Sequence, residues 1–374
     1  MKKTALLSVH SDPNYGSMLQ AYALSAVLNK LGCENEYISY EAYKKQNTFI
    51  VFIKQLIKHF LIFLHIKKIN KTEYSYWNTP EFRKQKELFN QFHRENIATS
   101  DRKYYSNTIA KANEIYNQFV IGSDQTWSPL FSSNPNSISF LPFVTDNSKK
   151  SSYAPSIGTT HINDEYLQTL KTKLSTFKNL SCREYSNAKL LTSYLGRKVE
   201  FVLDPTLLLS KDDWMKLSEP IEMPKQFVLC YVLGTKKSIY EYASKLAKIK
   251  NLPLYIIVTR PEYLSYKNAL KDVSVGQFLS LINQASYVVT DSFHGSIFSI
   301  NLGTNFYAFA KREVNNGFTD NDRIMDFLSC FHIEDRFIAD NDNRIPNDLD
   351  YSIIEGALSK MKTNSINYLI SIIK

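Results

Sequence analysis

The chain has 374 residues, which is enough for two domains of ordinary size, each with its own core. Apolar residues make up 44% and charged residues 22%, so a globular protein is expected and disorder is not the default. The formal net charge of +9 favours an anionic partner such as a phosphorylated metabolite, nucleic acid or a membrane face. No nucleic-acid-binding motif accompanies this charge, so nucleic acid is not expected as the partner.

Cysteine usage and the amino terminus both bear on the compartment. The four cysteines form no CxxC pair, so neither a structural zinc nor a disulfide framework is expected, and a reducing compartment fits. The apolar run after Met1, Lys2 and Lys3 is too short for a signal peptide. We therefore expect a cytoplasmic protein.

The first segment reads as a βαβ unit. Residues 4–9 are expected to form a strand, helical spacing of apolar residues follows up to Gly32, and residues 37–40 are expected to form a second strand. Asn14, Tyr15 and Gly16 lie in the first strand-to-helix turn, which can be a ligand loop. The turn lacks GxGxxG, so the dinucleotide fingerprint is absent.

Residues 49–66 are strongly apolar and aromatic but are interrupted by Lys54, Lys58 and His59. The interruptions argue against a transmembrane helix. A basic helical insertion of this kind can lie in a membrane interface, or it can pack on its own domain or on a second subunit.

A short buried strand at residues 119–121 is followed by small and polar residues, among them Asp124, Gln125 and Trp127. Such residues directly after a strand are typical of a pocket edge. A Gly-Ser-Asp turn with Trp127 as a plug explains them equally well.

Arg183 precedes a helix that is expected to continue to Leu195 and to stop at Gly196. We expect Arg183 in the first turn of this helix, where a cation opposes the helix dipole. An anion to be held there, or a salt bridge to Glu184 or another neighbour, would explain it.

The chain becomes polar and carries two prolines around residues 210–224, so we expect one domain over residues 1–210 and a second over residues 211–374. The α/β rhythm continues on both sides of this boundary. The remaining expected elements are helices at 82–92, 238–250, 275–285 and 351–374, and strands at 150–154, 199–203, 227–233, 254–258 and 305–309.

The stretch over residues 287–303 organises the second half. It reads as a β-branched strand, a turn rich in helix-capping residues, and a helix that stops at Gly303. In open α/β sheets, ligands bind at the carboxyl ends of strands, where the next helix presents its positive dipole end. His294 would stand there, although an ordinary N-cap beside a surface histidine is the plainer interpretation. Three basic residues follow this stretch, Lys311, Arg312 and Arg323. They either line an anion site or are charged residues on the solvated surface.

Six of these turns occur in the order seen in the polysaccharide pyruvyl transferase family, which the chain resembles from Asn14 to about Arg323. They cover residues 14–21, 121–125, 151–154, 181–184, 204–206 and 290–295. The resemblance implies a GT-B-like α/β fold, with two Rossmann-like domains facing each other across a cleft. It also implies an enzyme that takes pyruvate from phosphoenolpyruvate and installs it as a ketal across two hydroxyls of a sugar.

The resemblance also implies roles for individual residues. His294 matches the histidine that members place near phosphoenolpyruvate, and Arg183 matches an arginine that holds this anion. Many members carry Arg-Leu-His where this chain has Ser292, Phe293 and His294, so Lys311, Arg312 or Arg323 would replace the charge, or the donor would differ. The resemblance assigns Gly295 to the donor side and Asp124 to catalysis. The expected acceptor side consists of Asn14, Tyr15, Gly16, Gln125 and Trp127.

Ketal formation needs residues of these types. Phosphoenolpyruvate carries a carboxylate and a phosphate, so its site needs fixed cations and helix amides, and a histidine can supply or take the protons. The route needs no metal or cofactor, and no HExxH-like cluster is present. A sugar or a lipid-linked oligosaccharide at the inner membrane face is the expected acceptor. The alternatives are a GT-B glycosyltransferase that uses a nucleotide sugar, and a binding module without activity.

Overall fold

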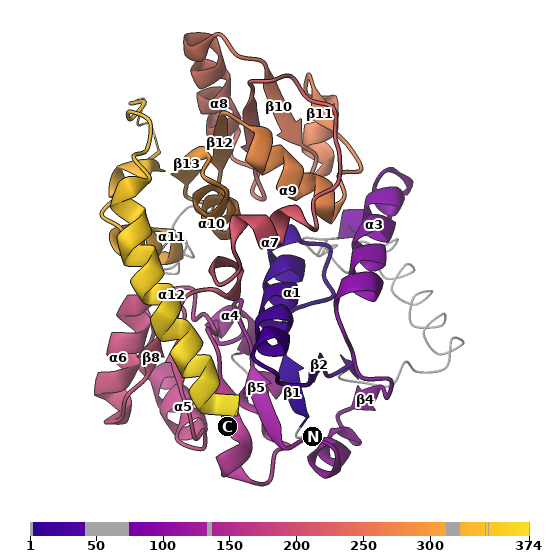
Figure 1. Cartoon of the computed structure of the whole chain (residues 1–374), viewed down its shortest axis with the longest axis vertical. Helices are drawn as coiled ribbons and strands as arrows, with labels where there is room; N and C mark the ends of the chain where they lie inside the picture. The colour runs from indigo at the N-terminus through magenta and orange to yellow at the C-terminus, as the bar shows by residue number, and fades with distance from the viewer. Residues whose placement is uncertain are drawn as a thin grey trace, which may run out of the picture.

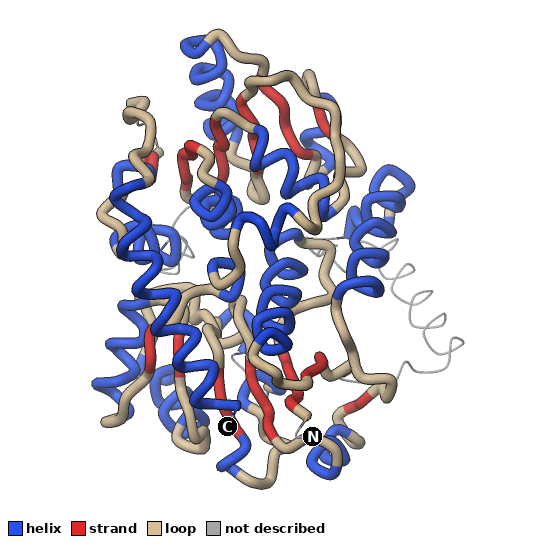
Figure 2. The backbone as a smooth tube through the Cα atoms, in the orientation of Figure 1, coloured by secondary structure: helices blue, strands red, loops and turns tan. Residues whose placement is uncertain are grey.

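The computed structural model describes residues 3–41, 75–132, 137–311, 322–340, 342 and 344–373. Two parallel β-sheets lie in different parts of the molecule (Figure 2). The first sheet has the order β2-β1-β5-β6. Its strands are β1 (Thr4–Leu7), β2 (Asn35–Tyr37), β5 (Gln118–Ile121) and β6 (Lys150–Ser152). All of its pairings are parallel. Two short parallel pairs accompany it, β3 (Tyr40–Glu41) with β4 (Tyr104–Tyr105) and β7 (Ser181–Cys182) with β8 (Glu200–Phe201).

The second sheet has the order β11-β10-β9-β12-β13-β14 and is also parallel throughout. Its strands are β9 (Val228–Tyr231), β10 (Leu254–Ile257), β11 (Ala269–Leu270), β12 (Tyr287–Thr290), β13 (Asn305–Phe309) and β14 (Phe337–Ile338). This is the doubly wound order of a Rossmann fold, in which the strand order reverses between β9 and β12. Strands β9 and β12 are buried along their whole length, as expected for a parallel sheet covered on both faces.

Helices connect the strands of both sheets. They are α1 (Tyr15–Lys30), α3 (Pro80–Asn96), α4 (Pro129–Ser132), α5 (Asp164–Leu174), α6 (Tyr185–Leu195), α7 (Lys211–Met215), α8 (Lys237–Lys250), α9 (Val275–Gln284), α10 (Phe293–Leu302), α11 (Asp322–Ser329) and α12 (Ser352–Ile373). Short 3-10 helices are η1 (Ser75–Asn78), η2 (Ile109–Glu114), η3 (Ile138–Phe140), η4 (Asn147–Lys149), η5 (Pro205–Leu207), η6 (Pro261–Ser265) and η7 (Glu334–Arg336).

Helix α1 lies where the two halves of the molecule meet (Figure 1). Its buried side chains belong to the same apolar core as the strands of the second sheet, and it contacts α9, α10 and η5. The last helix, α12, runs back from the second sheet to the first (Figure 1), where the Tyr368 hydroxyl donates to the Ser152 carbonyl at 2.9 Å. The two sheets are therefore joined by a continuous core and by the end of the chain.

The structure confirms the α/β class with two parallel sheets in the GT-B-like arrangement, and most of the expected elements. The expected strand at residues 37–40 is wrong as a single strand, because β2 ends at Tyr37 and β3 pairs elsewhere. Helix α6 begins at Tyr185, so Arg183 precedes it and does not lie in its first turn. Helix α10 begins at Phe293 with Ser292 as its N-cap, so His294 lies in the first turn of the helix that follows β12. The domain boundary at residue 210 stays a prediction.

Candidate active site

A cavity of about 460 Å³ opens at the carboxyl ends of both sheets. On the side of the first sheet, the cavity is lined by Leu7 at the end of β1 and Ile121 at the end of β5. On the side of the second sheet, it is lined by Leu233 after β9 and Asp291 after β12. Both strand pairs lie at points where the strand order reverses. Ligands of open α/β sheets bind at such points, so this cavity is the candidate site.

His294 lies in the first turn of α10 and lines the cavity, although only 6% of the residue is exposed. Its Nε2 atom lies 3.6 Å from Oδ2 of Asp204 and has no hydrogen-bond partner within the described residues. A methyl group at Gly16 would lie 2.1 Å from Nδ1 of His294, so only a glycine in α1 leaves room for this imidazole. The two halves thus meet at His294.

The buried carboxylate of Asp204 is contacted by side chains from both halves of the molecule. Its Oδ2 accepts from Nη1 of Arg183 at 2.8 Å and from Oγ of Ser123 at 2.9 Å, and Oδ1 accepts from the amide and hydroxyl of Thr206. Burial raises the pKa of Asp204, but the contact with His294 and the Arg183 guanidinium together hold that pKa far below its usual range. Asp204 is therefore ionised and oriented toward His294.

Arg183 is buried behind the cavity wall. Its guanidinium packs on the Phe293 ring, with Cζ 4.1 Å from the ring centroid, and Nε lies 3.5 Å from Oε1 of Glu184. Burial lowers the pKa of Arg183, but the charges of Asp204 and Glu184 raise it overall. Within the described residues, Nε and Nη2 have no hydrogen-bond partner. The salt bridge considered from the sequence is thus present, mainly to Asp204.

Asp124 follows β5 and lines the cavity from the first sheet. It adopts a φ of 75°, which is uncommon for a residue other than glycine, and its Oδ2 accepts from the Ser17 hydroxyl at 2.8 Å. Burial raises the pKa of this carboxyl, but the charges of His294 and Arg183 lower it overall. Asp12, an exposed residue on the same lining, shows the opposite direction, since desolvation at the cavity wall and the Asp124 charge raise its pKa. Two carboxyl groups of different acidity thus face one cavity.

On the second-sheet side, the side chains of Asp291 and Ser292 accept hydrogen bonds from backbone amides. The Asp291 carboxylate accepts from the amides of Leu233 and Gly234, both at 2.7 Å, which fixes the loop after β9. Ser292 is the N-cap of α10, and its hydroxyl accepts from the Gly295 amide at 3.2 Å. The plainer interpretation of this stretch as a capped helix is therefore correct for Ser292.

Two cations line the second-sheet side of the cavity, Lys311 and Arg323. The Arg323 guanidinium lies 5.7 Å from the centroid of the Phe293 ring. Arg312 lies outside the described residues, as does the segment over residues 49–66. An anion bound beside Lys311 and Arg323 would lie near the amino-terminal end of α10, which favours negative charge.

The family model for polysaccharide pyruvyl transferases matches residues 14–311, which include the elements around the cavity except β1 with the loop after it and α11. The chain belongs to this family. The protein is therefore an enzyme, a transferase that acts in polysaccharide biosynthesis. No curated protein matched the chain.

Among solved structures, the chain is similar to two UDP-GlcNAc 2-epimerases and a heptosyltransferase. The epimerase of Methanocaldococcus jannaschii, in complex with UDP-GlcNAc and UDP, is 13% identical with a TM-score of 0.46, covering 97% of this chain and 93% of that one. The epimerase of Neisseria meningitidis is 12% identical, with a TM-score of 0.47 and coverage of 99% and 100%. The E. coli ADP-heptose LPS heptosyltransferase II is 9% identical, with a TM-score of 0.35 and coverage of 97% and 99%. At these scores the similarities carry no functional inference.

Three of the residues that the pyruvyl transferase resemblance singled out are packed away from the large cavity. Trp127 is fully buried, donates its Nε1 to the Ser139 carbonyl and packs on Phe177, so it is the plug considered from the sequence. Tyr15 stacks on Phe278 and donates its hydroxyl to the Val273 carbonyl at 2.8 Å, which links the two halves. Gly295 packs α10 against Thr290, whose Oγ1 would lie 2.5 Å from an added methyl group.

Asn14 and Gln125 do line the cavity. The Asn14 side chain is also the N-cap of α1, since its Oδ1 accepts from the Ser17 amide at 3.1 Å. The Nε2 atom of Gln125 is buried and has no hydrogen-bond partner in the described ranges. Gln125 therefore offers a donor at the cavity wall.

Sequence reasoning assigned no role to Asp12, Ser17 or Asp204. Asp12 lies in the turn after the first strand, as Asp124 lies in the turn after β5, so its position offered the same signal. Asp204 was noted only as part of a turn shared with the pyruvyl transferases. Its closeness to His294 depends on the packing of the two halves, which no local pattern encodes. The described residues include no group of three or more His, Cys, Asp or Glu side chains arranged to hold a metal ion.

Proposed function

We propose that this member of the pyruvyl transferase family moves a pyruvyl group from phosphoenolpyruvate to two hydroxyls of one sugar in a surface-polysaccharide precursor. The observation that carries this proposal is that His294 and Asp124 line one cavity, with Oδ2 of the buried Asp204 3.6 Å from Nε2 of His294. A histidine beside carboxylates from the opposite half is suited to proton transfer between a donor and an acceptor held on different sides.

The donor would lie on the second-sheet side. Phosphoenolpyruvate carries a carboxylate and a phosphate, and Lys311 and Arg323 are the described cations that line this side of the cavity with His294. Arg183, which lies behind the wall, would act as a positioning residue, because its guanidinium holds Asp204 and supports the Phe293 ring. Ser292 would contribute the capped helix end and no charge of its own.

The acceptor would lie on the first-sheet side, near Asn14, Asp124 and Gln125. In the reaction, an acid protonates the methylene carbon of phosphoenolpyruvate while a sugar hydroxyl adds to the adjacent carbon and loses its proton. Phosphate then leaves with the C–O bonding electrons, and a second hydroxyl adds to the same carbon and loses its proton. The products are the ketal and inorganic phosphate, with His294 and Asp124 as the proton-transferring groups and no metal in the scheme.

The location of the reaction is also a proposal. A lipid-linked acceptor at the inner membrane face would agree with the basic, apolar sequence of residues 49–66. Among the described helices, none has the length and the apolar character needed to cross a bilayer. Reversing the charge of Lys54 and Lys58 should weaken binding to anionic liposomes, and unchanged binding would remove this part of the proposal.

The function is tested by phosphate release from phosphoenolpyruvate in the presence of sugar acceptors. His294→Asn should lower the rate by about 10²–10⁴-fold. His332→Asn, a change at an exposed histidine, is the matched control. Phosphoenolpyruvate at about a hundred times its dissociation constant should also stabilise the folded protein by about 2.7 kcal/mol. Stabilisation by a nucleoside diphosphate, with none by phosphoenolpyruvate, would replace this proposal by a glycosyltransferase.

A further inference from the structure

A second, much smaller cavity of about 20 Å³ adjoins the large one. Pro13, Asn14, Trp77 and Leu233 line both cavities, so the small one opens toward the proposed site. Its volume accommodates one water molecule or one small substituent, but not a sugar ring.

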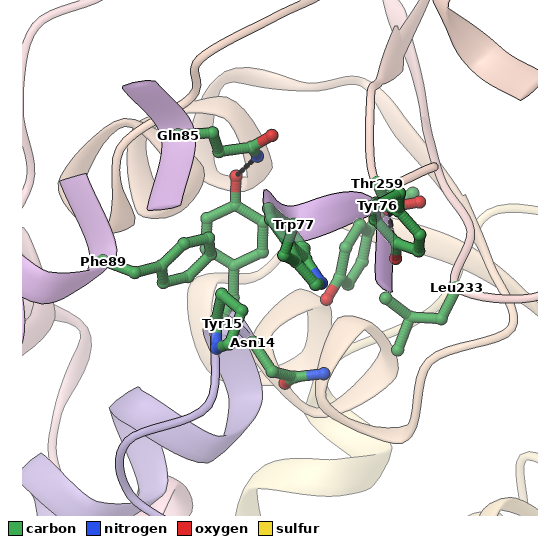
Figure 3. A pocket seen from close by; sticks show the side chains of 10 residues that line it. Asn14, Tyr15, Tyr76, Trp77, Gln85, Phe89, Leu233 and Thr259 are labelled. Carbon is green, nitrogen blue, oxygen red and sulfur yellow. Dashed lines mark hydrogen bonds between the residues drawn. The ribbon is translucent and has the colours of Figure 1, made fainter. Parts of the chain in front are cut away.

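The walls of the small cavity are mainly aromatic (Figure 3). In this view the Trp77 indole lies between the rings of Tyr15 and Tyr76. The centroid of the Trp77 ring lies 5.3 Å from that of Tyr76 and 5.9 Å from that of Phe89. These contacts hold the indole in one orientation, because every neighbouring ring is itself packed.

The hydroxyl groups of the two tyrosines around Trp77 are already engaged. The Gln85 side chain donates to the Tyr15 hydroxyl at 3.0 Å, drawn as a dashed line in Figure 3, and that hydroxyl donates to the Val273 carbonyl. The Tyr76 hydroxyl donates to the Thr259 carbonyl at 2.8 Å. The Oδ1 atom of Asn14 accepts from the Ser17 amide. These groups therefore serve the fold.

Trp77 differs from these groups. It is 93% buried, since its exposed fraction is 7%, and its Nε1 has no hydrogen-bond partner within the part of the chain that the structure describes. Buried N–H groups in folded proteins are almost always bonded, so this donor calls for an acceptor from outside the described chain. The adjoining large cavity is the route by which such an acceptor arrives.

The chemistry of the small cavity selects a neutral oxygen. No lysine, arginine or histidine is among the described residues that line it, and the unpaired donor of Trp77 is an uncharged indole N–H. An anion would instead be held beside Lys311 and Arg323 in the large cavity. Aromatic walls with one directional donor fit a hydroxyl or hydroxymethyl substituent of a sugar.

We propose that Trp77 forms a subsite that accepts one hydroxyl-bearing substituent of the acceptor sugar, with Nε1 donating a hydrogen bond to its oxygen. This inference rests on the proposed function, because it places the acceptor sugar in the large cavity. Trp77 then acts in acceptor specificity, since a sugar without this substituent leaves the indole N–H unpaired.

The test measures the binding of methyl hexopyranosides and of their monodeoxy derivatives to the wild-type protein and to Trp77→Phe, by saturation-transfer NMR. For one hydroxyl position, its removal from the sugar should weaken binding to the wild type about tenfold and should not weaken binding to Trp77→Phe. Tyr76→Phe is the control, because it changes the same cavity at a hydroxyl that the fold already uses; it should keep the wild-type preference.

Equal binding of every hexopyranoside to the wild type and to Trp77→Phe would overturn the proposal and leave a bound water as the partner of Nε1. The absence of any binding to the wild type would overturn it as well. Phosphate release from phosphoenolpyruvate with the best-bound sugar tests the proposed function separately. Trp77-dependent binding without phosphate release would keep the subsite and reject the pyruvyl transfer to that sugar.

Discussion

His10 and His93 form a pair whose protonation opposes folding. His10 Nδ1 and His93 Nε2 lie 2.9 Å apart, so one ring donates to the lone pair of the other and the contact needs a deprotonated nitrogen. Burial, followed by the charge of His93, lowers the pKa of His10 from 6.5 to about 4. Burial also lowers the pKa of His93. Acidification should therefore weaken the attachment of α3 to the loop after β1.

The size of the effect follows from linkage. In the unfolded chain His10 gains a proton as the pH falls below 6.5, whereas in the folded protein it stays neutral until about pH 4. The stabilising contribution is thus complete above pH 6.5 and is lost as the pH falls toward 4. The full difference amounts to about 3 kcal/mol, of which about 2 kcal/mol is lost between pH 7 and pH 5.

Guanidinium unfolding at pH 7 and pH 5 measures this loss. The wild type should lose about 2 kcal/mol more unfolding free energy than His10→Asn over this interval. His332→Asn removes an exposed histidine at a φ of 55°, which asparagine tolerates, and should behave as the wild type. If His10→Asn loses as much stability as the wild type, the pair does not carry the pH dependence and the reasoning is refuted.

Three further substitutions test the site. Gly16→Ala places a methyl group 2.1 Å from Nδ1 of His294 and should lower kcat for phosphate release about 100-fold. Gly356→Ala, with open space around it, is the control and should leave kcat unchanged. Asp204→Asn removes the closer of the two carboxylates beside the buried Arg183 charge and should cost about 3–5 kcal/mol of unfolding free energy. A stability equal to the wild type would contradict the pairing. Ser292→Ala removes the cap of α10 and should cost about 1 kcal/mol without changing KM for phosphoenolpyruvate, whereas a raised KM would show that the hydroxyl contacts the donor.

The strands were predictable because parallel strands that are buried on both faces leave continuous apolar runs in the sequence. Val288 and Val289, for example, are fully buried in β12 and belong to such a run. The positions of Asp124 and His294 near the cavity were predictable for a related reason. Each follows a strand, and the carboxyl ends of parallel strands share one edge of their sheet.

Other features depend on contacts between distant segments. From the sequence, Tyr15 resembled a ligand residue because a turn was expected there after a strand. It is instead the first residue of α1, and its ring stacks on Phe278, far away in sequence. The sequence around Trp127 is compatible with a pocket edge and with a buried plug. The contact of its ring with Phe177 decides between the two interpretations. Helix α5 escaped prediction, although Tyr166, Leu170 and Leu174 are buried along one face at a spacing of four residues.

The Asp204 cluster explains why the site draws on both halves of the chain. Asp204 is the N-cap of η5 and follows β8, the last strand of the first half. Arg183, the residue after β7, forms an ion pair with it. His294 approaches the same carboxylate from α10, packed beside Gly16. A rotation that moved α10 away from η5 would separate His294 from Asp204. The orientation of the proposed proton donor is therefore set by the packing between the halves, which α1 and α12 maintain.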